Sequence, residues 1–311
     1  METSQAEKKD DNPITEDSPN IPRKFNYNKH YKILLLIPLI ILLVSLVYLG
    51  IFYSKNGDII YRDVSLSGGT SITINGEIDQ IALESGLREK FLDVSFTKLE
   101  DITSRKEIAL IVESSATPEE LKPEIESILG YKLTDENSST EFTGATLSQN
   151  FYRQLVTALI ISFILMSIVI FVLFRTFIPS IAVIFAVFAD IAIPLAVIDF
   201  FGIELSAAGI AAFLMLIGYS VDTDILLTSR ALKSKEGAVN GRIFGAFKTG
   251  IFMTLTALAA VLPAFFLVTG LPDSFRQIFL ILAIGLCADI LNTWLTNAGI
   301  IKWHCEKKGV N

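Results

Sequence analysis

The chain has 311 residues, of which 51% are hydrophobic, and its formal net charge is −7. This composition excludes an ordinary soluble domain, and the negative charge gives no support for nucleic-acid binding. The sequence contains no Gly-x-x-x-x-Gly-Lys-Ser/Thr loop for phosphate, so no nucleotide is expected either. We therefore expect an integral membrane protein of the α-helical class.

The N-terminal part of the chain predicts a tail, a membrane span and then a folded domain. Residues 1–30 are polar and rich in Asp, Glu, Lys, Asn and Pro, which is typical of a disordered tail. Residues 31–53 form the first apolar run, and no small-x-small cleavage site follows it, so we interpret it as an uncleaved span. Residues 54–150 are of mixed polar character and predict a folded domain inserted between two spans.

Within this domain, two periodicities alternate along the chain. Alternating apolar residues predict strands over 70–75, 92–97, 107–112 and 131–143, and helical spacing predicts helices over 77–90 and from Thr117. Thr117-Pro-Glu-Glu120 also has the pattern of a capping box. The order β-α-β-β-α-β predicts a ferredoxin-like α+β domain, in which two helices cover one face of an antiparallel sheet.

Two sequence features describe the surface of this domain and its first strand. The uncovered face of the sheet should be polar, since Ser71, Thr73, Ser95 and Thr97 all fall on it. The double glycine Gly68-Gly69 comes where the chain enters the first strand. We expect both glycines to have backbone conformations that a Cβ atom would obstruct.

Five further apolar runs follow the domain, over residues 151–174, 177–201, 205–228, 243–268 and 275–303, and 304–311 form a second short tail. Six membrane spans result. Lys and Arg residues near the spans gather on one side, with only Arg153 and Arg276 at the edges of the other. The positive-inside rule then places both termini in the cytoplasm and the inserted domain outside the cell membrane.

Four aspartates lie in the interior of these spans, away from their ends, namely Asp190, Asp222, Asp224 and Asp289. A bare aspartate at membrane depth costs at least about 3 kcal/mol, so a functional ion or proton site is the preferred interpretation. The alternative is a carboxylate that only bonds a neighbouring helix. As proton carriers we rank Asp222 first, Asp190 and Asp224 next, and Asp289 last, because the Asn and Thr residues that follow Asp289 suit a structural polar patch.

Helix geometry separates the two acids of the fourth span. Residues two positions apart point about 200° apart, so Asp222 and Asp224 cannot face the same neighbour. Gly218 shares a stripe with Asp222, and Ser220 shares a stripe with Asp224. The two acids should therefore meet different partners.

The sequence gives no indication of an enzyme. Its two histidines are His30 in the N-terminal tail and His304 near the C-terminus. No nucleophile with a base and no cluster of metal ligands can be recognised, so neither a cofactor nor a metal is expected. Cys287 and Cys305 are 18 residues apart, about 27 Å on one helix, which excludes a disulfide between them.

Several motifs together carry a resemblance to a known family. Gly218-Tyr-Ser-Val221 is followed by Asp222, Ser67-Gly-Gly-Thr70 follows the first span, and Thr143-Gly-Ala-Thr146 leads into the second. With the six-span layout, these motifs make the chain, from about residue 66 to its end, similar to the SecF family. SecF is the smaller membrane subunit of the SecD-SecF complex of protein export, a relative of the RND transporters.

The resemblance implies residues as well as a function. Ala189-Asp-Ile191 resembles the family's His-Asp-Val, and Lys248-Thr249 occupies the place of an Arg-Thr pair. The four aspartates would form the proton pathway, supported by Gly218, Tyr219, Ser220, Lys248 and Thr249. Bacterial members continue Gly-Tyr-Ser-Val with Asn-Asp-Thr, whereas this chain has Asp222-Thr-Asp224.

The function implied by the resemblance is proton-driven assistance of polypeptide export, by half of an RND-like bundle. A SecD-like subunit, a SecY-type translocon and the translocating polypeptide would be its partners. Two other hypotheses remain open. One is an RND-type half-transporter that exports a small molecule or lipid by proton antiport, and the other is a membrane scaffold without transport.

Overall fold

The computed structural model of the protein describes residues 27–100, 104, 106–234, 238–267 and 273–308. Most of the predicted N-terminal tail lies outside the described residues. Its last four residues do not, because the first helix, α1 (Tyr27–Asn56), begins at Tyr27. The predicted C-terminal tail is likewise helical as far as Lys308. Basic residues in this last turn suit the negative end of a helix, which favours its continuation.

Six helices are long and apolar enough to cross a membrane, which confirms the predicted number of spans. After α1 they are α5 (Ala145–Phe174), α6 (Phe177–Phe200), α7 (Ala207–Lys233) and α8 (Val239–Leu267). The sixth combines α9 (Asp273–Leu291), the π-helix η1 (Asn292–Asn297) and α10 (Ala298–Lys308). Half or more of the most apolar stretch of α6, α7 and the sixth span is buried, whereas α1, α5 and α8 expose most of theirs.

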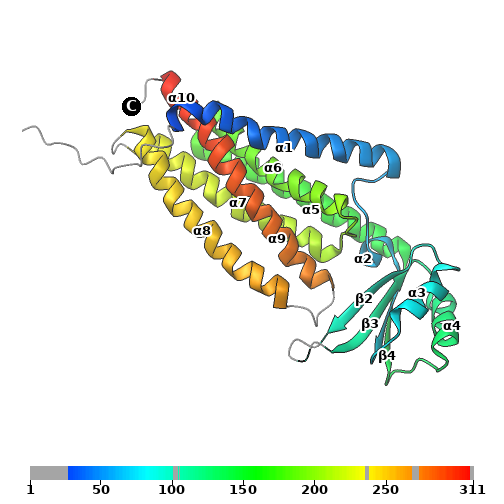
Figure 1. The fold of residues 1–311 in the computed structure, drawn as a ribbon. Helices are drawn as coiled ribbons and strands as arrows, with labels where there is room; N and C mark the ends of the chain where they lie inside the picture. Colours follow the sequence, from blue (N-terminus) through cyan, green and yellow to red (C-terminus); the bar gives the residue numbers. More distant parts are fainter. Residues whose placement is uncertain (1–26, 101–103, 105, 235–237, 268–272, 309–311) are drawn as a thin grey trace, which may run out of the picture.

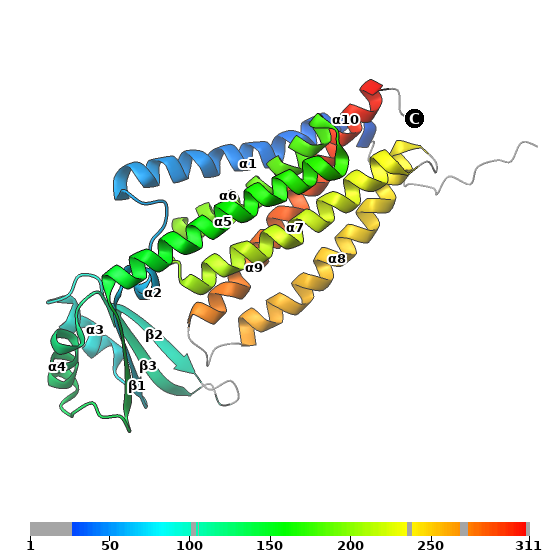
Figure 2. The ribbon, with the colours of Figure 1, turned by 180° about the vertical axis from the view of Figure 1, so that it is seen from behind.

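The two ends of the bundle differ. The start of α1 and the end of α10 lie together at one end, where Tyr31 Oη donates a hydrogen bond to Glu306 Oε2 (2.9 Å). The inserted domain lies beyond the other end, as Figures 1 and 2 show. Helix α5 reaches into the domain, since it begins at Ala145 rather than at the predicted residue 151.

The inserted domain follows a short helix, α2 (Val64–Ser67). Its elements are β1 (Gly69–Asn75), α3 (Gln80–Arg88), β2 (Ser95–Glu100), β3 (Glu107–Ser114), α4 (Pro118–Leu129) and β4 (Ser138–Thr143). The order agrees with the predicted β-α-β-β-α-β sequence of elements. The strands lie in the order β2-β3-β1-β4 and all neighbours are antiparallel.

Two predicted strands were too long at their N-terminal ends. Strand β2 begins at Ser95 rather than residue 92, and Leu92 is 96% exposed instead of packing in the core. Strand β4 begins at Ser138 rather than residue 131. Here Asn137 closes a turn by accepting a hydrogen bond from the Thr134 N–H (2.7 Å), and the turn prevents pairing before Ser138.

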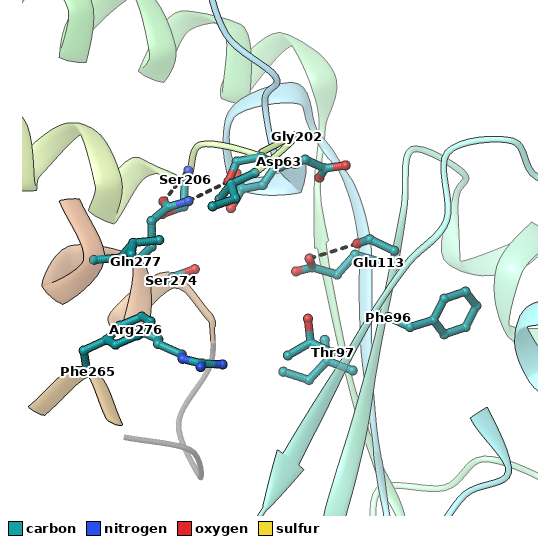
Figure 3. Close-up of a pocket in the computed structure, with 15 residues that line it drawn as sticks. Asp63, Phe96, Thr97, Glu113, Gly202, Ser206, Phe265, Ser274, Arg276 and Gln277 are labelled. Carbon is teal, nitrogen blue, oxygen red and sulfur yellow. Dashed lines mark hydrogen bonds between the residues drawn. The ribbon is translucent and has the colours of Figure 1, made fainter. Parts of the chain in front are cut away.

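One face of the sheet builds the domain core and the other stays open. The core side chains come from β1 and β3, from α3 and α4 and from the adjoining loops: Ile72, Ile74, Leu83, Leu87, Val94, Leu110, Val112, Leu121, Ile125 and Leu133. The open face carries Ser71, Thr73, Ser95 and Thr97, all half-buried. The four predicted residues make it largely polar, but Ile111 of β3, which pairs with Thr73 and Thr97, lies on the same face. Part of the face is directed toward the membrane bundle (Figure 3).

Gly68 and Gly69 stand where the domain joins the bundle. Their φ values are +85° and +142°, which side chains rarely adopt. A Cβ atom on Gly68 would collide with the backbone of Ala145, and one on Gly69 with the backbone of Ser114. The two glycines thus permit the start of β1 to pass close to β3 and to the first residue of α5.

Candidate functional site

Three buried aspartates meet inside the bundle, each from a different helix. Asp190 of α6, Asp224 of α7 and Asp289 of α9 all have 0% of their surface exposed. Each carboxylate accepts hydrogen bonds from side chains of at least one other helix, which holds the three most buried spans together. We call this group the aspartate network.

Asp190 connects α6 to both neighbouring helices. Its Oδ2 atom accepts a hydrogen bond from Ser220 Oγ of α7. Its Oδ1 atom accepts one from Asn292 Nδ2 of η1 (2.6 Å). A change in the charge of Asp190 therefore alters the bonding of α6 to two helices at once.

Asp224 and Asp289 share a single hydroxyl group. Thr293 Oγ1 lies 3.0 Å from Asp224 Oδ1 and 2.9 Å from Asp289 Oδ1. A hydroxyl has one proton and can donate to only one carboxylate at a time. The second contact forms a hydrogen bond when that carboxyl group carries a proton itself. Thr293 is thus placed to pass a proton between the two acids.

Other contacts complete the network but leave one carboxylate oxygen without a partner. Asp289 also accepts from Thr223 Oγ1 (3.0 Å), and Asp224 accepts from Asn297 Nδ2 (2.6 Å). Asp224 Oδ2 is buried and has no hydrogen-bond partner. In the described ranges, no Lys or Arg side chain pairs with any of the three acids. Keeping three unneutralised charges here is costly, so the network is suited to holding and exchanging protons.

The π-helix η1 explains why so many polar side chains of the sixth span point inward. Its wider turn, with bonds of the i→i+5 type, lets Asn292, Thr293, Thr296 and Asn297 all be buried. Three of these four side chains donate hydrogen bonds to the network. The sequence showed this polar stretch, but an α-helical reading could not predict that all four residues turn inward.

Asp222, ranked first from the sequence, lies outside the network. It is exposed on the surface of α7, in a stripe with Ala211, Met215 and Gly218. Asp224, two residues later, is fully buried. The two acids thus face different surroundings, as helix geometry predicts.

The remaining predicted residues lie on α7 and α8. Ser220 donates a hydrogen bond to Asp190 of the network, whereas Tyr219 packs against the buried contact between α8 and α9. Lys248 is exposed on α8, and Thr249 accepts a hydrogen bond from Arg230 Nη1 (2.9 Å). The structure therefore does not bring Lys248 and Thr249 to the network.

Asp199 is a buried acid that the sequence analysis missed. It lies in the last turn of α6, 2% exposed, and neither of its carboxylate oxygens has a hydrogen-bond partner. The sequence signal that could have identified Asp199 is its position within the apolar run 177–201, near the end of the run. Acids near span ends usually reach the interface, so this position did not suggest burial.

The joint between bundle and domain uses the same helices as the network. The loop between α6 and α7 bonds the segment that leads into the domain: Leu205 N–H donates to Tyr61 O (2.7 Å), and Asp63 N–H donates to Leu205 O (3.2 Å). Gln277 of α9 holds this loop, since its Nε2 donates to Glu204 O (2.6 Å) and its Oε1 accepts from Ser206 N (2.8 Å). All three network helices thus lead directly to the joint.

A cavity of about 510 Å³ lies between the open face of the sheet and this end of the bundle (Figure 3). Thr97 and Glu113 line its sheet side, and the Arg276 guanidinium extends into it from α9. Asp63 and Glu204 also line the cavity. Burial raises the pKa of Asp63 to about 6 and also raises the pKa of Glu204.

Fold and site together define a class, a multi-pass membrane protein with an acid network in its bundle and an α+β domain inserted after its first span. The family model of the protein export membrane protein SecD/SecF, C-terminal, matches residues 126–307. SecF of Methanolacinia petrolearia is 36% identical over 297 residues, covering 92% of this chain and 99% of that protein. SecF of Methanothermobacter thermautotrophicus is 38% identical over 284 residues, covering 89% and 94%. The chain belongs to the SecF family of protein-export membrane proteins.

Solved structures show the same fold. SecDF from Thermus thermophilus, a translocon-associated membrane protein, is similar with a TM-score of 0.68 and 19% identity, over 90% of this chain and 38% of that chain. SecDF in a super-membrane-facing form is similar with a TM-score of 0.53 and 18% identity, over 93% and 40%. This chain therefore corresponds to less than half of the SecDF polypeptide.

Proposed function

We propose that this chain is an auxiliary subunit of the Sec translocation machinery and uses proton flux to assist polypeptide export across the cytoplasmic membrane. One observation carries the proposal: the same helices, α6, α7 and α9, carry the aspartate network along their length and the joint to the inserted domain at one end. Protonation changes which hydrogen bonds join these helices. The domain would then move with the loop between α6 and α7.

The inserted domain would act on the polypeptide outside the cell. Its element order and sheet order fit the ferredoxin-like class. The cavity beside its open sheet face has mixed walls, with apolar side chains such as Ile111 and Phe265 and with both signs of charge, Glu113 opposite Arg276. Such walls can contact an extended polypeptide without requiring a particular amino-acid sequence.

The proposed orientation places both termini in the cytoplasm. The contact between Tyr31 and Glu306 puts the start of α1 and the end of α10 at one end of the bundle. Lys233, Lys307 and Lys308 lie in the last turns of helices at that end. The positive-inside rule favours the cytoplasm for this end and the outside for the domain.

The surface of α7 supports a second membrane subunit as the partner. Asp222 is exposed at membrane depth beside Gly218 and Met215, where contact with lipid would cost at least about 3 kcal/mol. A SecD-like subunit covering this stripe would complete an RND-like bundle of two related halves. A SecY-type translocon would deliver the polypeptide. The chain itself would bind no cofactor and catalyse no covalent reaction.

The test compares proton-dependent export in membrane vesicles carrying Asp190→Asn, Asp224→Asn or Asp289→Asn variants. Each change keeps the size of the side chain and removes its titrating proton. We expect each variant to lose most of the export that depends on the proton gradient, at unchanged membrane abundance. Asp135→Asn, which alters an exposed acid of the inserted domain, is the matched control and should export normally.

Other outcomes would favour the other hypotheses. Normal export by all three variants would refute the proton pathway and favour a scaffold. Loss of proton-coupled small-molecule export, with polypeptide export intact, would favour the half-transporter.

A further inference from the structure

A second cavity, of about 260 Å³, lies at the other end of the bundle, far from the inserted domain. Three elements line it: the α5–α6 junction with Phe174 and Thr176, the end of α7 with Leu232 and Lys233, and α10 with His304, Cys305 and Lys308. No acid is among these lining residues. The acid of this turn of α10, Glu306, instead accepts the hydrogen bond from Tyr31.

The cavity gathers positive charge from separate helices. Lys233 comes from the last turn of α7, and Lys308 comes from the last turn of α10. Lys233 is held in place because its Nζ atom donates to Leu173 O (3.3 Å) and lies 5.6 Å from the centre of the Phe174 ring. His304, which is 5% exposed, can donate a hydrogen bond from an imidazole N–H.

The start of α6 adds donors of a second kind. Thr176 is the N-cap residue of this 24-residue helix, yet its side chain does not cap the helix. Its Oγ1 atom is buried and has no hydrogen-bond partner. The first N–H groups of α6, at Phe177 and Ile178, therefore have no side-chain cap. An uncapped helix N-terminus favours an anion.

We propose that this cavity binds the phosphate group of an anionic phospholipid headgroup. Two lysines, a histidine, a free hydroxyl and a helix N-terminus are complementary to a phosphate. The cavity lies where the spans end, which is the depth of headgroups in a bilayer. Phe174 and Leu232 supply an apolar wall for the start of the acyl chains. A bound lipid would join α6, α7 and α10 at the end of the bundle opposite the domain.

The test is native mass spectrometry of the full chain in detergent, with phosphatidylglycerol and phosphatidylcholine added at equal concentration. We expect the chain to retain phosphatidylglycerol in preference. A lysine beside a bound anionic headgroup contributes roughly a fivefold change in affinity, so Lys233→Gln with Lys308→Gln should reduce retention by roughly 25-fold. Lys307→Gln is the matched control, because Lys307 lies in the same turn with its Nζ 5.3 Å from the Trp303 ring centre and does not line the cavity.

Three results would overturn the proposal. The first is equal retention of the two lipids, and the second is unchanged retention in the double variant. The third is displacement of phosphatidylglycerol by an equal concentration of inorganic phosphate, which would make free phosphate the ligand. If the double variant fails to fold, Lys308→Gln alone decides, since this exposed side chain should lower retention roughly fivefold.

Discussion

At the scale of single residues, Asp63 links the joint to pH. The carboxylate accepts a hydrogen bond from Ser65 Oγ (2.6 Å), and the N–H groups of Leu66 and Ser67 donate to the Asp63 carbonyl (3.1 and 2.9 Å). Burial raises the pKa of Asp63 from 3.8 to about 6. Because folding raises this pKa, the protonated form of Asp63 is the one that is compatible with a stable folded joint. The contribution of Asp63 to stability is therefore complete below about pH 4 and is lost as pH rises through about 6.

We expect hydrogen-exchange protection of the Leu66 and Ser67 amides to fall between pH 4 and 7 in the wild-type chain. A shift of about two units corresponds to at most about 3 kcal/mol of local stability. Asp63→Asn keeps the size and an acceptor oxygen but cannot titrate, so its protection should not vary over this range. Asp135→Asn should keep the wild-type pH dependence. An unchanged pH dependence in Asp63→Asn would assign the effect to another group.

The depth of the network acids could be predicted from the sequence, but their partners could not. Asp190, Asp224 and Asp289 stand inside apolar runs, and length alone places them at membrane depth. Which hydroxyl reaches which carboxylate depends on how three helices are rotated against each other. Asp222 directly follows the Gly-Tyr-Ser-Val motif and yet is exposed, because an acid inside an apolar run gives no local signal of whether its side of the helix packs against the rest of the chain.

At the scale of elements, the start of β1 depends on a close approach that only glycine permits. Gly69→Ala should destabilise the inserted domain, because its Cβ would strike the Ser114 backbone in addition to the strain of a φ of +142°. Gly76→Ala is the matched control, since Gly76 has a φ of +113° but no atom within 4 Å of the Cβ position.

The strain alone costs about 1–2 kcal/mol, and the collision should add about 1–3 kcal/mol in Gly69→Ala. Pulse proteolysis of the full chain in detergent would measure the population of the opened domain. Equal losses of stability in the two variants would show that backbone conformation, and not the contact with β3, requires glycine at position 69.

Secondary structure was most predictable where local chemistry decides it. Glu120 accepts a hydrogen bond from the Thr117 N–H (3.2 Å), as the capping-box pattern predicts. The π-helix was not predictable, because Asn292–Asn297 has no local signal that separates an i→i+5 turn from an α-helical one. Its stability comes from partners on α6 and α7, which lie about 70 to 100 residues away in sequence.

At the scale of the whole molecule, the spans differ in how far they are buried. Only α6, α7 and the sixth span are well buried, while α1, α5 and α8 expose apolar side chains along most of their length. Lipid can cover such a surface, but it cannot cheaply cover the Asp222 stripe of α7. The described part of the molecule thus has three acids in its interior and, on the outer surface of α7, the exposed Asp222.

The last prediction concerns orientation in the membrane, with the inserted domain outside the cell and the opposite end of the bundle in the cytoplasm. In a background with Cys287 and Cys305 replaced, a cysteine at Ser139 in β4 should react with an impermeant thiol reagent added to intact cells. A cysteine at Asn240, in the first turn of α8, should react only after the membrane is opened. Both positions are exposed, so accessibility within the fold does not limit either reaction.

The physical reason for this orientation is the charge at the end that holds Asn240. Lys233 and Arg242 flank the loop between α7 and α8, and Lys307 and Lys308 end α10 beside it. Moving this cluster across the membrane is disfavoured during insertion. Labelling of Asn240→Cys but not of Ser139→Cys in intact cells would reverse the orientation. The inserted domain would then lie in the cytoplasm, where it could not receive a polypeptide that has already crossed.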